Sequence, residues 1–175
     1  RINWGQRSHV IPLVPENSPP LRARLLWAGA AVFALGVTLS VQQIRTTDRQ
    51  MRDDLLHQAT LLSWAVNADQ VSSLAGTPDD LDSILYQRIH EQLQKVLALH
   101  PWLKFIYIMR KDAAGHILFL VDTEPTDSPD FSPPGQPYDE ATPVLHAIFD
   151  TGHPATEGPT SDRWGTWVSA LVPLL

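Results

Sequence analysis

The sequence predicts an α+β protein in which a single transmembrane helix continues into a long stalk helix, followed by a domain built on an antiparallel sheet. Three observations favour this fold class. The stretch from Leu25 to Val41 carries no charge, and no glycine or proline follows it until Gly76. Beyond that point, apolar residues alternate in short segments such as Trp102 to Met109, which is typical of strands.

The uncharged stretch, extended to Ile44, is about 20 residues long. At about 1.5 Å per residue it covers roughly the thickness of a bilayer's hydrocarbon core. We therefore assign 21–44 to a transmembrane helix. Arg22 and Arg24 precede the uncharged stretch, and basic residues accumulate on the cytoplasmic side of a span. We expect 1–20, which is rich in proline, to be a disordered cytoplasmic tail, and 45–175 to lie outside the membrane.

Two other interpretations of the same stretch stay open. One is a cleaved signal peptide, but its apolar core would be shorter, and Ser40-Val41-Gln42 is a poor cleavage site. The other is a buried helix of a soluble protein, since Gly29 and Gly36 lower its hydrophobicity.

Composition excludes several classes of function. The chain has no cysteine, so it has no disulfide framework, no thiolate zinc site and no cysteine nucleophile. Its net charge is −6, with no basic patch, which argues against nucleic-acid binding. The seven histidines form no HxH, HxxxH or HExxH pattern, and no glycine-rich phosphate loop is present. We expect no metal site, no cofactor and no kinase active site.

The residues after the span read as a stalk helix from Gln42 to Leu74. Apolar residues recur in it about every 3.5 positions, as at Ile44 and Met51, a spacing that favours pairing with a second copy in a homodimer. Further along, Leu62 and Val66 are expected to pack on their own domain instead.

The remaining elements follow from caps, breakers and apolar spacing. They are a helix from Thr77 to Leu99, strands at Trp102–Met109 and Ile117–Val121, a packed proline-rich loop from Asp122 to Glu140, a short helix from Pro143 to Gly152, and strands near Ala155–Glu157 and Thr166–Val172 with a turn at Asp162–Gly165 between them.

Four stretches carry a resemblance to a known family: Phe105–Arg110, Phe119–Asp122, Ser132–Asp139 and Asp162–Ser169. Together with the order of elements, they resemble a Cache-type (PAS-like, PDC) extracytoplasmic sensor domain of a bacterial transmembrane receptor. The likeness covers 42–175 and is greatest to the sensors of histidine kinases. It implies a five-stranded antiparallel sheet whose last, central strand follows Leu175.

The resemblance further implies a protein of the bacterial inner membrane, a homodimer that belongs to a two-component system. Its periplasmic domain would bind a small solute, such as an amino acid or an organic acid, and signal to a cytoplasmic output. Three alternatives remain: a sensor of a diguanylate cyclase or chemoreceptor, an anchored binding protein, and a periplasmic hydrolase that uses acids among Asp122, Asp139 and Asp162.

The candidate ligand-binding residues lie on the predicted strands, at the end of the long loop and in the last turn. Arginine beside an aromatic ring suits a carboxylate, and an aspartate suits an amine. The candidates are Tyr107, Arg110, Asp122, Tyr138, Asp139, Asp162, Arg163 and Trp164.

Structural roles are the alternative for several of these candidates. Tyr107 and Trp164 could be packing aromatics. Arg110 could be a solvated strand end, and Asp122 could cap the loop that follows it. Arg163 and Asp162 could pair with each other at the surface.

Overall fold

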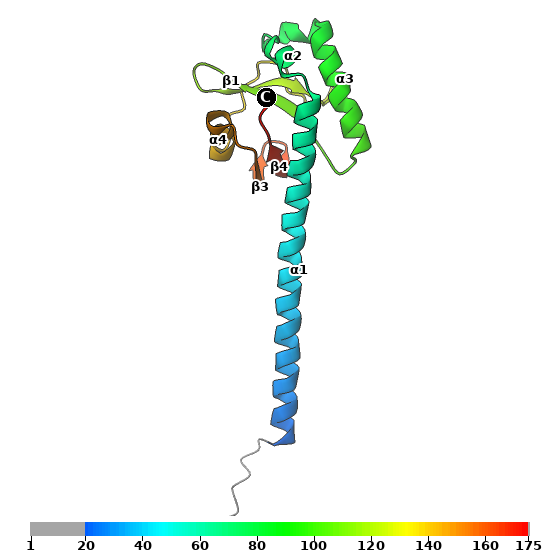
Figure 1. Cartoon of the computed structure of the whole chain (residues 1–175), viewed down its shortest axis with the longest axis vertical. Helices are drawn as coiled ribbons and strands as arrows, with labels where there is room; N and C mark the ends of the chain where they lie inside the picture. The colour runs from blue at the N-terminus through cyan, green and yellow to red at the C-terminus, as the bar shows by residue number, and fades with distance from the viewer. Residues whose placement is uncertain (1–19, 175) are drawn as a thin grey trace, which may run out of the picture. The chain divides into compact units, whose positions relative to one another are not determined.

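The computed structural model describes residues 20–174. The predicted disordered tail, apart from Pro20, lies outside the described residues. The chain divides into two compact units, residues 1–46 and 47–175. Helix α1, Leu21–Ala65, runs from the first unit into the second without interruption (Figure 1).

The part of α1 in the first unit is compatible with a membrane span. Among the described residues, α1 is the one helix that is long and apolar enough to cross a bilayer, and its apolar stretch is not buried. The exposed fraction is 64% for Leu25 and 74% for Phe33. In water such side chains would be unfavourable, whereas lipid tails are as apolar as the side chains themselves.

The stalk helix is shorter than the sequence predicts. It ends at Ala65 rather than near Leu74, and a separate helix, α2, spans Ala68–Ser72. Asn67 has extended backbone angles, and its side-chain oxygen accepts a hydrogen bond from the Gln70 N–H at 3.0 Å. This N-cap starts α2 and turns the chain so that Val66 and Val71 are both buried.

The predicted helix from Thr77 to Leu99 is also divided in two. A 3₁₀-helix, η1, covers Pro78–Asp82, and α3 covers Ile84–Leu99. The division falls at Ser83, whose hydroxyl accepts a hydrogen bond from the Tyr86 N–H and caps α3.

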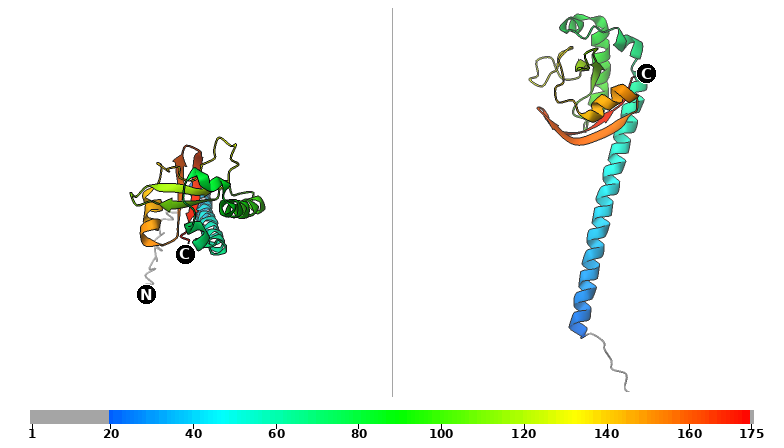
Figure 2. Two further views of the ribbon diagram at one scale, coloured as in Figure 1. Left: turned by 90° about the horizontal axis from the view of Figure 1, so that it is seen from above. Right: turned by 90° about the vertical axis from the view of Figure 1, so that its left-hand side faces the viewer.

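Two antiparallel hairpins follow, each a separate two-stranded sheet. The first pairs β1, Tyr107–Lys111, with β2, Ile117–Asp122; the second pairs β3, Ala155–Asp162, with β4, Gly165–Leu171. Figure 2 shows β3 and β4 as a curved ribbon. Strand β1 starts later than predicted, because its ladder begins where Tyr107 pairs with Asp122, the last residue of β2. Ile106 extends this contact only by hydrogen bonds with the backbone N–H and the hydroxyl of Thr123.

The proline-rich loop is packed against β2. The Tyr138 N–H donates to the Ile117 carbonyl, and the Gly135 N–H donates to the Phe119 carbonyl, both at 2.8 Å. The loop thereby runs along the free edge of β2 in place of another strand. Gly135 has a positive φ of 88°, and a Cβ there would meet the Gly76 carbonyl oxygen, so only glycine fits.

Helix α4, Pro143–Thr151, has the ends that the sequence predicts. The Thr142 hydroxyl accepts from the Leu145 N–H, and Gly152 closes the helix in the left-handed conformation with a φ of 67°.

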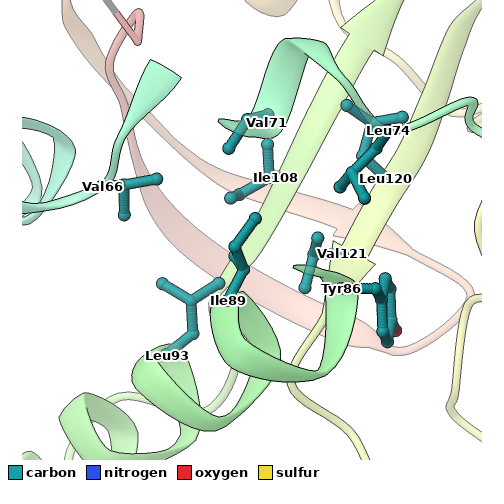
Figure 3. Close-up of a cluster of buried hydrophobic side chains, with 9 residues drawn as sticks. All are labelled: Val66, Val71, Leu74, Tyr86, Ile89, Leu93, Ile108, Leu120 and Val121. Carbon is teal, nitrogen blue, oxygen red and sulfur yellow. The ribbon is translucent and has the colours of Figure 1, made fainter. Parts of the chain in front are cut away.

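The core lies between the helices and β1–β2, and Figure 3 shows its side chains. Leu93 of α3 and Val121 of β2 are almost fully buried, and Leu62 packs against this cluster, as predicted. The buried members are Val66, Val71, Leu74, Tyr86, Ile89, Leu93, Ile108, Leu120 and Val121. A second, smaller cluster joins β2 to α4 and β4 through Ile117, Leu145, Ile148 and Leu171.

Candidate functional site

A cavity of about 1130 Å³ lies within the second unit, lined by both hairpins and by residues of helices α1 to α4. One part of its wall combines aromatic rings with a carboxylate. We call this part the aromatic–carboxylate cluster, and its members are Tyr107, Phe119, Tyr138, Asp162, Trp164 and Trp167. They come from β1, β2, the proline-rich loop and the β3–β4 hairpin, so the cluster exists only when the domain is folded.

Asp162 organises this cluster. Its Oδ1 accepts hydrogen bonds from the Trp164 N–H at 2.9 Å, the Gly165 N–H at 3.1 Å and the Trp167 indole N–H at 3.0 Å. Its Oδ2 accepts a bond from the Tyr138 hydroxyl at 3.1 Å. The carboxylate therefore fixes the β3–β4 turn and ties it to the proline-rich loop.

The aromatic rings meet in the geometries that their quadrupoles favour. Phe119 is at the centre, with its ring edge-on to Tyr107, Tyr138 and Trp164 at centroid distances of 5.5, 5.6 and 5.9 Å. Tyr138 and Trp164 lie more nearly parallel, 6.1 Å apart. Such pairs each add about 0.5–1.5 kcal/mol beyond the burial of their area.

The surroundings hold these phenols in their neutral form. Burial raises the pKa of Tyr107 to about 12, helped by the negative charge of Asp162. Burial and the same carboxylate also raise the pKa of Tyr138 above its ordinary value. Burial, with a smaller contribution from the charge of Asp122, raises the pKa of Tyr86 in the main core to about 12.

These shifts give an expected dependence of stability on pH. Each phenol keeps its proton to a higher pH when folded than when unfolded, so between the two pKa values the unfolded chain has lost protons that the folded chain retains. The free energy of unfolding should therefore fall as pH rises above about 10. Denaturant titrations at about pH 9 and about pH 11 measure it.

The chain supplies a direct check, because it has only three tyrosines and all three are in this group. Ultraviolet absorbance should show phenol ionisation well above the ordinary pKa in the folded protein, and Tyr107→Phe should reduce the fall in stability. Ionisation of all three at the ordinary value would contradict the structure.

Arg163 is held by a residue other than the one that sequence suggested. Its guanidinium makes two hydrogen bonds to Glu140, at 3.1 and 2.9 Å, and lies 4.5 Å from the centre of the Trp164 ring. The pairing with Asp162 that we considered is therefore wrong. Asp139 is exposed and makes no hydrogen bond to the cluster.

Asp122 lines the cavity but anchors the loop. It is 3% exposed, and its two oxygens accept the N–H groups of Glu124 at 3.0 Å and Ser132 at 2.9 Å. Burial raises the pKa of this carboxyl. These contacts match the alternative role given above, in which Asp122 caps the loop that follows it.

Arg110 supports the helices and is not part of the aromatic–carboxylate cluster. Its guanidinium donates to the backbone carbonyls of Leu74 at 3.0 Å, Val71 at 3.2 Å and Ser72 at 3.4 Å. These carbonyls lie at and just after the end of α2, and the Val71 carbonyl also accepts the Leu74 N–H at 3.2 Å. A cation there also interacts favourably with the helix dipole.

We expect Arg110→Ala to destabilise the second unit by about 2 kcal/mol, because hydrogen bonds from a charged donor are lost and the carbonyl of the buried Leu74 loses the guanidinium that it accepts from. Arg88→Ala is the matched control, since Arg88 is exposed on α3 and should cost under about 0.5 kcal/mol. Denaturant unfolding of both variants measures the difference. Equal stabilities would show that Arg110 has no structural role.

Two members of the cluster were not among the predicted candidates. Phe119 reads as an ordinary strand residue, and nothing in its local sequence marks it as central to the cluster. Trp167 reads as part of the last predicted strand, yet the turn from Asp162 to Gly165 brings its indole back onto the carboxylate. An aspartate and a tryptophan flanking a tight turn are the signal that could have indicated this contact.

Comparisons with protein-family models, with curated proteins and with solved structures found no match. Within residues 20–174, no group of three histidine, aspartate or glutamate side chains is placed to hold a metal ion.

Proposed function

We propose that this chain is the membrane-anchored sensor region of a bacterial signal-transduction receptor. Its second unit binds a small solute outside the inner membrane and signals to a cytoplasmic output, most like that of a histidine kinase. The observation that carries the proposal is a solute-sized cavity in a unit whose first helix continues from an apolar segment long enough to span a bilayer.

The cavity supports binding of a small molecule. Ligand sites are concave, mostly apolar and equipped with a few placed polar groups. This one combines aromatic rings with the partly exposed carboxylate of Asp162, and its polar groups come from four separate segments. A ligand seated there would contact both hairpins and would favour the conformation in which they are closest to it.

Helix α1 supports the transmission of a signal. A ligand shifts an equilibrium between two states only by its different affinity for them. Because Leu62 and Val66 pack in the core beside Leu93, a change in that core acts directly on the end of α1. The helix is continuous to Leu21, so a displacement of its end requires no separate linker to reach the bilayer.

The Cache-type fold is part of the proposal. The second unit has two antiparallel hairpins, and α3 packs against the hairpin of β1 and β2. The proline-rich loop runs along β2. These features support a Cache-type fold.

The proposed homodimer can be tested with introduced cysteines, because the chain has none of its own. We expect Ile44→Cys and Met51→Cys to form intermolecular disulfides in membranes, since both lie on the apolar seam of the stalk. Arg49→Cys, which lies off that seam, should not cross-link. Equal cross-linking at all three positions would argue against a defined dimer.

The signalling function has its own test in the full-length receptor. A flexible Gly-Ser segment inserted after Ile44 should abolish the response of the output while leaving solute binding intact, because α1 would no longer be rigid. An insertion of alanines of the same length is the control for added length. A response that survives the Gly-Ser insertion would refute transmission through α1.

A further inference from the structure

We infer that the aromatic–carboxylate cluster is a binding site for a quaternary ammonium cation. The inference rests on the proposed function, because it names the class of solute that the cavity takes. It follows from three properties of the cluster: the uncompensated charge of Asp162, the hydrogen bonds that this carboxylate already accepts, and the aromatic rings around it.

Asp162 makes no ion pair with a cationic side chain among residues 20–174, although its charge contributes to raising the pKa of Arg163. Its hydrogen-bond partners are two backbone N–H groups, an indole and a phenol, and all are neutral. The neighbouring Arg163 is turned to Glu140, and Lys111, which also lines the cavity, pairs with Asp150. A partly buried carboxylate without a counter-ion favours a bound cation.

The hydrogen bonds of Asp162 select among cations. A carboxylate offers about four lone-pair positions, and four donors already approach this one. Three of them point at Oδ1, which leaves at most one acceptor position, on Oδ2. A primary ammonium group brings three N–H donors, most of which this carboxylate could not accept. A quaternary ammonium group has no N–H and needs no acceptor.

The aromatic rings supply what a quaternary ammonium group does need. Its methyl groups pack on ring faces, and its charge is attracted by their quadrupoles, by about 0.5–2 kcal/mol for each ring. The cluster already shows this affinity for cations at its rim. The Arg163 guanidinium lies over Trp164, and the Lys104 ammonium lies 5.1 Å from the centre of the Phe105 ring, which in turn contacts Trp167.

Choline is a suitable probe, with ethanolamine as its matched comparison, because the two differ in the methyl groups on nitrogen and carry the same charge. In isothermal titration calorimetry on the whole chain in lipid nanodiscs, we expect choline to bind about tenfold more tightly than ethanolamine, or better.

Asp162→Asn removes the charge and keeps an oxygen that can accept the three bonds of the turn. It should weaken choline binding about tenfold or more, whereas Asp127→Asn, the same change at an exposed position of the loop, should leave it within about twofold. Tyr107→Leu should weaken binding while Tyr107→Phe, which keeps the ring, should not. Thermal unfolding shows whether each variant is folded. If Tyr107→Leu is unfolded, the effect of Asp162→Asn on choline binding tests the site.

The inference is overturned if choline does not bind, if ethanolamine binds as tightly, or if Asp162→Asn has no effect. Succinate and glutamate, titrated in the same way, distinguish failure of the quaternary ammonium site from failure of the proposed solute-binding function. If one of them binds in place of choline, the quaternary ammonium site is wrong and the solute-binding function stands. If none of the four binds, both are wrong.

Discussion

Replacing Ala34 and Leu35 together by aspartate should remove the chain from the membrane. An acidic side chain at the centre of a transmembrane helix costs about 3 kcal/mol, so the pair costs roughly 6 kcal/mol. Both residues lie near the middle of the uncharged stretch and have no partner in the described structure that could hold a charge. Alkaline extraction of membranes should find the parent chain in the pellet and the variant in the supernatant or degraded.

The control for this result places the same two charges outside the span. Gln50→Asp with Met51→Asp changes exposed positions of the same helix, so it should leave the chain in the membrane pellet. If both double variants stay in the pellet, the apolar part of α1 is not what holds the chain there.

Among single leucine-to-alanine substitutions in the second unit, Leu93→Ala should produce the largest loss of stability. Leu93 is 1% exposed and packs in the main core. Truncation removes buried apolar surface and leaves a cavity, which together cost about 2–5 kcal/mol. Denaturant unfolding followed by circular dichroism measures the change.

The same helix provides the matched control. Leu99, at the end of α3, is 78% exposed, so Leu99→Ala should change the free energy of unfolding by under about 0.5 kcal/mol. A similar loss for both variants would mean that Leu99 is covered in solution, for instance by a second copy. No loss for Leu93→Ala would contradict the packing of α3 on β1–β2.

Local signals predicted the local structure well. The short helix α4 begins and ends as expected because Thr142, Pro143 and Gly152 determine its ends through contacts within a few residues. The turn from Asp162 to Gly165 was expected for the same reason, since the aspartate accepts bonds from the backbone of the two residues that close it.

Sequence alone did not predict where the long helices break. No glycine or proline interrupts Gln42 to Leu74, and although asparagine is favoured at an N-cap, a single asparagine costs a helix interior only a fraction of a kcal/mol, so Asn67 does not by itself indicate a break. The break at Asn67 is favoured because it lets Val66 and Val71 enter a core made with α3 and β1. That contribution to stability depends on residues distant in the chain, which a local pattern does not contain.

The candidate site shows the same limit. Asp162, Tyr138, Tyr107 and Trp164 are brought together as a cluster, whereas Arg110 caps a helix that precedes it by 36 or more residues. The partner of Arg163 is Glu140, 23 residues away, and not its neighbour in sequence. Residue type identified which side chains can recognise a solute, but only the fold shows which of them are already occupied.

The central claim is that α1 crosses the membrane once and leaves the second unit outside. Labelling with a membrane-impermeant maleimide tests it directly, since any introduced cysteine is the only one in the chain. We expect Asp127→Cys to be labelled in cells whose outer membrane alone is permeable, and Pro20→Cys to be labelled only after the inner membrane is opened. Protection of Asp127→Cys until the inner membrane is opened would contradict the account.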